Sequence, residues 1–138
     1  MRRGFYVLTL MVATLSSAVA DNAEDHTRAC VDPAQKQICD ASKSDFKKWF
    51  PRAYKGDYQG QRNVAFCLYD GCDGSVMQNK PLSCAWRMVI LLSGSNQVDA
   101  TDQNSFRLAC GKLDTAEMIT AKAQAERLRG QIRTGSRR

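Results

Sequence analysis

Residues 80–92 read KPLSCAWRMVILL and form the most apolar helical pattern that follows residue 20. Pro81 suits the first turn of a helix, where its missing backbone N–H leaves no bond unmade, and Gly94 with Ser95 ends the pattern. Because the apolar side chains recur at three- and four-residue steps, we expect this segment to be the central helix of the fold. These side chains are Leu82, Ala85, Trp86, Val89, Ile90 and Leu92.

Two helices are expected before this segment. Ser44 fits the N-cap of the first, whose apolar positions are three or four residues apart. Pro51 lies inside that pattern, so the helix is either kinked there or starts later, with Pro51 in its first turn. Gly56 ends it, Asp57 caps the next helix, and Gly71 ends that one.

Two further helices are expected after the central segment. Asp99 or Asp102 opens a fourth, which runs to Cys110, and Asp114 caps a fifth that spans residues 116–129. No stretch shows the alternation of paired β-strands. The expected fold is therefore all-α, a short stack of antiparallel helical hairpins.

The N-terminus carries the features of a cleavable signal peptide. Arg2 and Arg3 precede an apolar run over residues 5–15, and Ala18-Val19-Ala20 places small residues where a signal peptidase reads. The alternative is a transmembrane anchor, but the Ala-x-Ala ending and the lack of a basic stop favour cleavage before Asp21. The protein is thus expected to be exported to the periplasm or secreted, with no transmembrane segment after cleavage.

The chain has six cysteines, all after the predicted cleavage site. An even number in an exported chain predicts three disulfides. No two cysteines have the Cys-x-x-Cys spacing that is typical of zinc sites and of thioredoxin-like redox centres. One possible pairing is Cys30 with Cys39, Cys67 with Cys72 and Cys84 with Cys110. Its main rival joins Cys67 to Cys84 and Cys72 to Cys110. The cysteines are Cys30, Cys39, Cys67, Cys72, Cys84 and Cys110.

A second pattern spans residues 49–94, where glycines and packing residues have the spacing of a helical-repeat hairpin. The matching positions are Gly56, Asp57, Gln61, Asn63, Ala65, Gly71, Val76, Asn79, Trp86 and Gly94. This spacing resembles the Sel1-like repeats, which are α-solenoid relatives of tetratricopeptide repeats. The sequence departs from that family at Val64-Ala65, where Leu-Gly is usual, and in a longer turn before Val76. The resemblance implies contact with protein partners through a concave surface lined by helices.

These patterns predict four parts: a signal peptide over 1–20, a flexible leader with a Cys-closed loop over 21–43, a helical-repeat domain over 44–133, and a basic disordered tail over 134–138. Such arrays normally need about three repeats, so the disulfides are expected to offset a short stack. The net charge falls from +6 to +4 when Arg2 and Arg3 are removed. The basic tail is interpreted as a solvated helix end, with weak contact to an anionic surface as the alternative.

No catalytic or metal-binding motif is present, and no cofactor is expected. His26, the one histidine, falls in the predicted leader, and Asp70 and Asp73 are interpreted as turn formers. The resemblance to Sel1-like repeats implies that Trp49 and Trp86 pack between helices. Aromatic and arginine side chains dominate many protein interfaces, which makes five residues the candidates for partner binding. They are Arg52, Tyr54, Tyr58, Arg62 and Tyr69.

The leading hypothesis is a non-catalytic interaction module of the bacterial envelope, with a protein partner and no nucleic acid. The first alternative is a disulfide-stapled inhibitor of an envelope or extracellular enzyme, acting through the loop 72–79. The second is a thiol redox or metal protein that uses Cys67 and Cys72, which requires a pair that is free or easily reduced.

Overall fold

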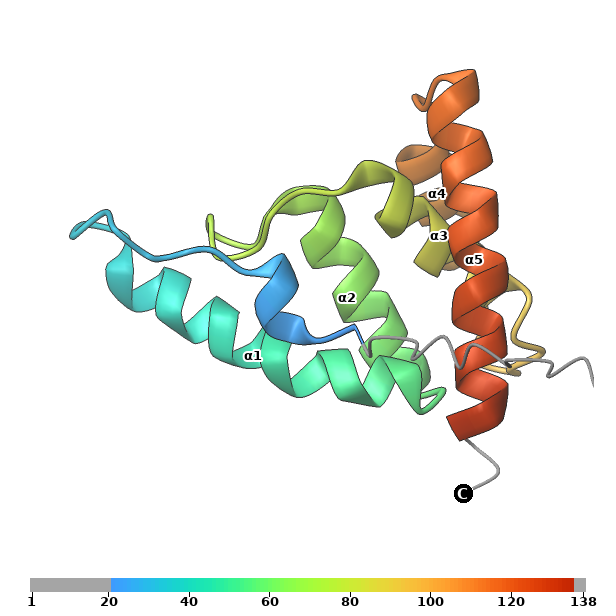
Figure 1. Cartoon of the computed structure of the whole chain (residues 1–138), viewed down its shortest axis with the longest axis horizontal. Helices are drawn as coiled ribbons and strands as arrows, with labels where there is room; N and C mark the ends of the chain where they lie inside the picture. Colours follow the sequence, from blue (N-terminus) through green and yellow to red (C-terminus); the bar gives the residue numbers. More distant parts are fainter. Residues whose placement is uncertain (1–20, 136–138) are drawn as a thin grey trace, which may run out of the picture.

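The computed structural model describes residues 21–135, which form five α-helices and one short 3-10 helix (Figure 1). The predicted signal peptide and residues 136–138 lie outside the described residues. In chain order the elements are η1 (Ala23–His26), α1 (Lys36–Tyr54), α2 (Tyr58–Asp70), α3 (Lys80–Leu91), α4 (Ala100–Cys110) and α5 (Thr115–Gly135). The all-α prediction is confirmed for this part of the chain. No helix among residues 21–135 has both the length and the apolarity needed to cross a membrane.

Helix α3 is the centre of the packing, as its apolar pattern predicted. It contacts α2, α4 and α5, while α1 packs mainly on α2. Trp86 and Cys84 are fully buried, and only a few positions of α3 reach solvent. The fifth helix packs along α3 rather than mainly on α4, so the last two helices are organised around α3 and not around each other.

Helix α1 begins at Lys36, well before the start predicted at Ser44, and continues through Pro51. The prediction was wrong because residues 36–43 are mostly polar and show no apolar stripe; Cys39 is the one buried side chain among them. Its disulfide to Cys30 ties the preceding loop to the first turns of the helix. The disulfide stabilises this end of the helix. The periodicity of the sequence gives no sign of that end.

Residues 21–35 were predicted as part of a flexible leader, but the structure gives them defined partners. Thr27 forms an isolated antiparallel bridge with Val76, and the N–H groups of Arg28 and Met77 donate to the carbonyls of Ser75 and His26. In Figure 1 this segment crosses α1 and continues beside the loop between α2 and α3. The leader is therefore part of the folded domain.

The predicted caps define most helix starts. The Asp57 side chain accepts from the N–H of Gly60 at 2.6 Å at the start of α2. Asp99 and Asp102 together form a capping box at α4, so both residues predicted to open that helix contribute. At the other end α5 extends to Gly135, past the predicted end near Arg129, so the first residues of the predicted disordered tail are helical.

All six cysteines form disulfides, in the first of the two predicted pairings. Cys30 is bonded to Cys39, Cys67 to Cys72 and Cys84 to Cys110. The rival pairing is wrong because Cys84, on α3, lies next to Cys110 at the end of α4, while Cys67 in the last turns of α2 lies next to Cys72 in the turn that follows. The 84–110 bond is buried with Ala121 in a small apolar cluster.

Candidate partner-binding surface

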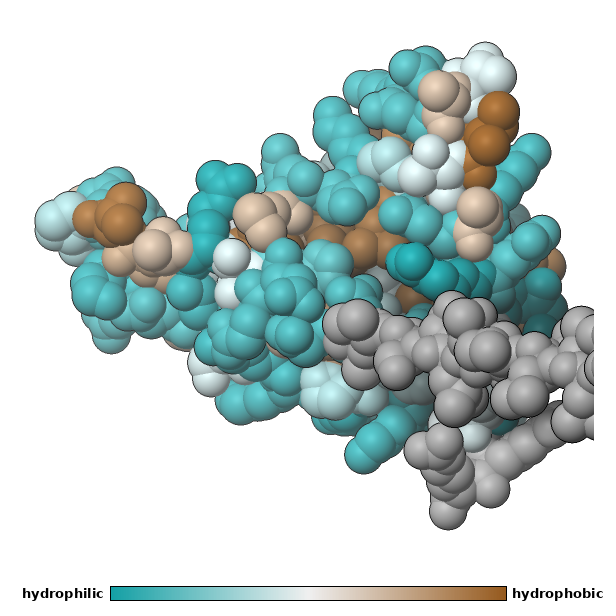
Figure 2. Space-filling view, in the orientation of Figure 1, coloured by the Kyte–Doolittle hydropathy of each residue, from teal (hydrophilic) through white to brown (hydrophobic). Residues whose placement is uncertain are grey.

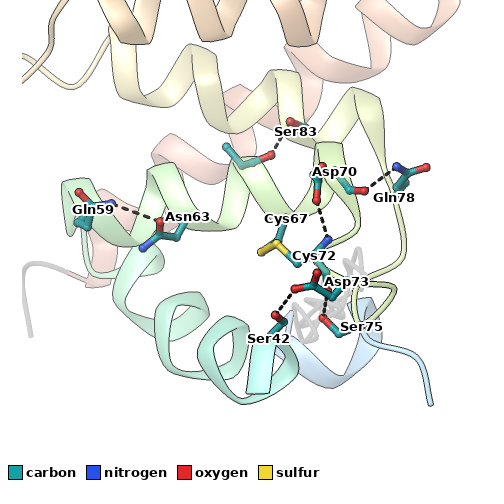
Figure 3. Close-up of a disulfide and its surroundings, with 11 residues drawn as sticks. Ser42, Gln59, Asn63, Cys67, Asp70, Cys72, Asp73, Ser75, Gln78 and Ser83 are labelled. Atoms are coloured by element: carbon teal, nitrogen blue, oxygen red, sulfur yellow. Dashed lines mark hydrogen bonds between the residues drawn. A yellow bond between two sulfur atoms is a disulfide. The ribbon is translucent and has the colours of Figure 1, made fainter. Parts of the chain in front are cut away.

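A hollow of about 200 Å³ lies between the outer sides of α1 and α2. Helix α1 contributes Trp49, and α2 contributes Phe66 and Asn63. Phe66 is 51% exposed, a large fraction for an aromatic side chain on a packed helix. Figure 3 shows Asn63 and Cys67 on the side of α2 that faces α1. The hollow therefore combines three aromatic rings, of which that of Phe46 is buried, with an amide; its other lining residues are Ser42, Asp45, Cys67 and Cys72.

The predicted candidate Arg52 lies one turn along α1 from Trp49. Its guanidinium carbon is 4.3 Å from the centre of a Trp49 ring, and its Nη2 is 3.0 Å from a carboxylate oxygen of Asp57. Both contacts hold the side chain in one orientation beside the ring. Hydrogen bonds from the Gly60 N–H and Arg52 also hold the pKa of Asp57 below its usual value.

Two other predicted candidates, Tyr58 and Arg62, belong to a cluster between α2 and α4. The Tyr58 hydroxyl donates to Oδ2 of Asp102 at 2.6 Å and accepts from Nη1 of Arg62 at 3.2 Å. Nε of Arg62 is 3.3 Å from Oδ1 of Asp102, which is only 1% exposed. Desolvation and the bond to Asp102 raise the pKa of Tyr58. Because these side chains are engaged with one another, the cluster joins two helices rather than presenting free groups.

Arg87 of α3 lies beside this cluster and is almost completely buried. Burial lowers the pKa of its guanidinium, and the neighbouring charge of Arg62 adds to that effect, while Asp102 opposes it. The buried carboxylate of Asp102 thus lies near two arginines, Arg62 and Arg87. Neither Arg87 nor the ion-pair role of Asp102 was singled out from the sequence, because the residues next to them in the chain do not mark either as part of a charged cluster.

Tyr54 is turned toward the N-terminal segment. Its hydroxyl donates to Oδ2 of Asp21 at 2.8 Å, while Oδ1 of Asp21 is 3.0 Å from Nε2 of His26. Burial raises the pKa of Tyr54, and the hydrogen bond to Asp21 adds to the shift. The ring also packs edge-on against Trp86 with a 5.1 Å separation of centres. Tyr54 therefore has a structural role that its sequence position did not suggest.

A larger cavity of about 910 Å³ lies beside Tyr54, with Phe50 and Pro51 among its apolar lining residues. His26 does not line this cavity; its ring packs against Phe46 and Phe50 instead. Asp21 does line the cavity, so of the Asp21–His26 pair only the carboxylate side faces it. Within residues 21–135 no group of three or more His, Cys, Asp or Glu side chains is placed to hold a metal ion.

Apolar side chains elsewhere on the surface are scattered. Figure 2 shows brown areas separated by hydrophilic surface on the face in view. The large apolar residues that are at least 40% exposed among residues 21–135 are Val31, Ile38, Phe66, Met77, Leu92, Leu108 and Ile119. Phe66 differs from the others in that it lines a hollow together with a second aromatic ring.

The remaining predicted sites are less suited to binding. Tyr69 is half-buried on α2. In the loop 72–79, Cys72, Ser75 and Val76 are buried and Asn79 is half-buried, so the exposed part is limited to Asp73, Gly74, Met77 and Gln78. Comparison with known proteins gave no match to a family model, a curated sequence or a solved structure.

Proposed function

We propose that this chain is an exported, non-catalytic module that binds a protein partner through the hollow between α1 and α2. The observation that carries the proposal is the exposed Phe66 beside Trp49, with Asn63 at the same surface. Small-molecule and cofactor sites usually enclose about 300–1,000 Å³. A hollow of about 200 Å³ instead has room for one or two side chains of a partner.

The energetics favour an occupant that buries the Phe66 ring. Full burial of a phenylalanine side chain contributes about 1.5–3 kcal/mol, so the exposed half of Phe66 corresponds to about 1 kcal/mol. The residues that dominate the binding energy of protein interfaces are typically aromatic side chains surrounded by a polar rim. The Asn63 amide supplies part of that rim: its oxygen accepts from Nε2 of Gln59 at 3.3 Å, and its NH2 group can donate to a peptide carbonyl. The expected partner therefore inserts an apolar side chain with its backbone alongside α2.

The Sel1-like interpretation of residues 49–94 is part of this proposal. It is supported by the helix bounds, since α2 begins directly after Asp57 and ends at Gly71, and by the packing of α2 on α3. Export is supported by the N-terminal pattern and by three disulfides, which persist in oxidising compartments.

The test compares Phe66→Asp with Ile119→Asp in the full chain. Ile119 is 65% exposed on α5, so its variant is a matched control for a charge on an exposed apolar position. A tagged protein is recovered from the envelope of its host, co-purifying proteins are identified, and the affinity for the enriched partner is then measured. We expect the wild-type chain and I119D to bind equally, and F66D to bind at least about tenfold more weakly.

Equal affinity of F66D and the wild-type chain would show that the hollow is not the binding surface. Recovery of no enriched partner would contradict the interaction proposal itself. Recovery of one enzyme whose activity the chain blocks would favour the inhibitor alternative instead.

A further inference from the structure

The turn that follows α2 has an unusual backbone. Four consecutive residues have positive φ angles: Gly71 at 94°, Cys72 at 41°, Asp73 at 57° and Gly74 at 75°. Cys72 and Asp73 are the only non-glycine residues with positive φ in the part of the chain that the structure describes. A side chain with a Cβ is sterically disfavoured in this region, and such residues persist only where the surroundings hold them.

The surroundings here are one covalent bond and several hydrogen bonds. Cys72 is bonded to Cys67 in the last turns of α2. The Ser75 hydroxyl donates to the Cys72 carbonyl at 2.6 Å, and the Ser42 hydroxyl of α1 donates to Oδ2 of Asp73 at 2.6 Å. Figure 3 shows these groups gathered around the disulfide. The disulfide is the covalent constraint among those that hold residues 71–74 at positive φ angles.

The three disulfides differ in accessibility and in backbone strain. Cys84 and Cys110 are 0% and 3% exposed, whereas in the 67–72 bond Cys72 is buried at 9% but Cys67 is half-buried and lines the hollow between α1 and α2. The Cys30–Cys39 bond is also near the surface, but neither of its residues has a positive φ. The 67–72 bond alone combines a reachable sulfur with a strained partner residue.

We propose that Cys67–Cys72 is a thiol–disulfide exchange site that accepts electrons from a dithiol reductant. A thiolate of the reductant attacks Sγ of Cys67, the bond between the two cysteines breaks, and Cys72 leaves as a thiolate that takes up a proton. The second thiol of the reductant, after loss of its proton, attacks the mixed disulfide. Cys67 then leaves in turn, so two electrons have passed to the protein and the reductant has become a disulfide.

Reduction removes the tie on Cys72 and lets residues 71–74 leave the left-handed region. The Ser42–Asp73 bond and the Thr27–Val76 bridge are attached to this loop, so its rearrangement reaches α1 and the N-terminal segment. Because Cys67 and Cys72 line the hollow between α1 and α2, reduction is also expected to change partner binding there. That second effect rests on the proposed function. The exchange itself does not depend on a partner.

The experiment is a reductant titration of the folded, oxidised chain. Protein is equilibrated with increasing dithiothreitol, quenched with acid and alkylated, and each cysteine is quantified by peptide mass spectrometry. Cys67 and Cys72 are expected to be half-labelled at about tenfold less reductant than Cys30 and Cys39, and before Cys84 and Cys110. Labelling of Cys30 and Cys39 first, or of all three pairs together, would overturn the proposal.

A pair of glycine variants tests the role of the backbone. A Cβ at Gly74 or at Gly130 meets nothing within 4 Å, but only Gly74 has a positive φ. Gly74→Ala therefore adds left-handed strain without a clash, while Gly130→Ala in α5 adds none. We expect G74A to lower the reductant needed for the 67–72 bond about fivefold, which corresponds to about 1 kcal/mol, and G130A to leave it unchanged. An unchanged requirement in G74A would show that strain does not set the reactivity of this bond.

Discussion

Removal of the buried 84–110 disulfide should cost more stability than removal of the 67–72 disulfide. The bond joins residues 26 apart in sequence, and the chain-entropy relation gives about 3.5 kcal/mol for a closed loop of that length. The same relation gives about 2 kcal/mol for the 5-residue separation of Cys67 and Cys72. Cys84 also packs against Ala121, so loss of two buried sulfurs adds a packing cost to the larger figure.

The variants are the double substitutions Cys84→Ala with Cys110→Ala, and Cys67→Ala with Cys72→Ala as the matched control. Each is compared with the oxidised wild-type chain by urea unfolding at neutral pH, followed by circular dichroism at the helical band. The expected losses in the free energy of unfolding are about 4–5 kcal/mol for the first variant and at most about 2 kcal/mol for the second. Relief of the left-handed turn makes the second loss smaller still.

Equal, large destabilisation of the two variants would contradict this expectation. That result would mean that the 67–72 bond stabilises the native turn far beyond its effect on the unfolded chain. Equal, small losses in both variants would instead show that the unfolded chain keeps the helices α3 and α4 close together without the bond.

Two other perturbations test the charged groups. Asp102→Asn keeps the shape of the side chain but leaves Arg62 and the buried Arg87 without a counter-charge; we expect a loss of about 3 kcal/mol in urea unfolding, and a loss below about 0.5 kcal/mol would contradict the role of the ion pair. Stability should also fall as pH drops below about 4, because hydrogen bonds to backbone N–H groups hold the pKa values of Asp57 and Asp99 below the usual 3.8. Groups with lowered pKa values stabilise the fold above the unfolded-state pKa, and that contribution is lost as pH falls through the folded-state value. Asp57→Asn should therefore flatten the acid limb in thermal unfolding, and an unchanged pH profile would rule out this source of acid sensitivity.

The sequence predicted those features that depend on local pattern. The central position of α3 follows from its apolar side chains and the start of α2 from the cap at Asp57. For the cysteines the sequence left two pairings open, and the observed pairing is one of them. The early start of α1 was missed because a disulfide, and not an apolar stripe, ties residues 36–43 to the domain.

The candidate site was predicted only in part, for a related reason. Arg52, Tyr58 and Arg62 were singled out by residue type, but their surroundings depend on contacts between distant parts of the chain. Asp102 is 44 residues from Tyr58, and no local signal pairs them. Phe66 was not among the predicted candidates, since periodicity does not tell which apolar positions of a helix a neighbour leaves uncovered.

The shared use of one Asp102 oxygen couples two events that are separate in most helical proteins. Oδ2 accepts from the Tyr58 hydroxyl and also from the backbone N–H of Asp99, so the same atom fastens α2 and completes the first turn of α4. Fraying at the start of α4 therefore also breaks the Tyr58 contact, and loss of that contact weakens the first turn of α4, while α2 stays packed on α1 and α3. Amide hydrogens at residues 99–103 should consequently exchange with solvent in one cooperative opening, as a unit that includes the α2 contact, rather than by independent end fraying.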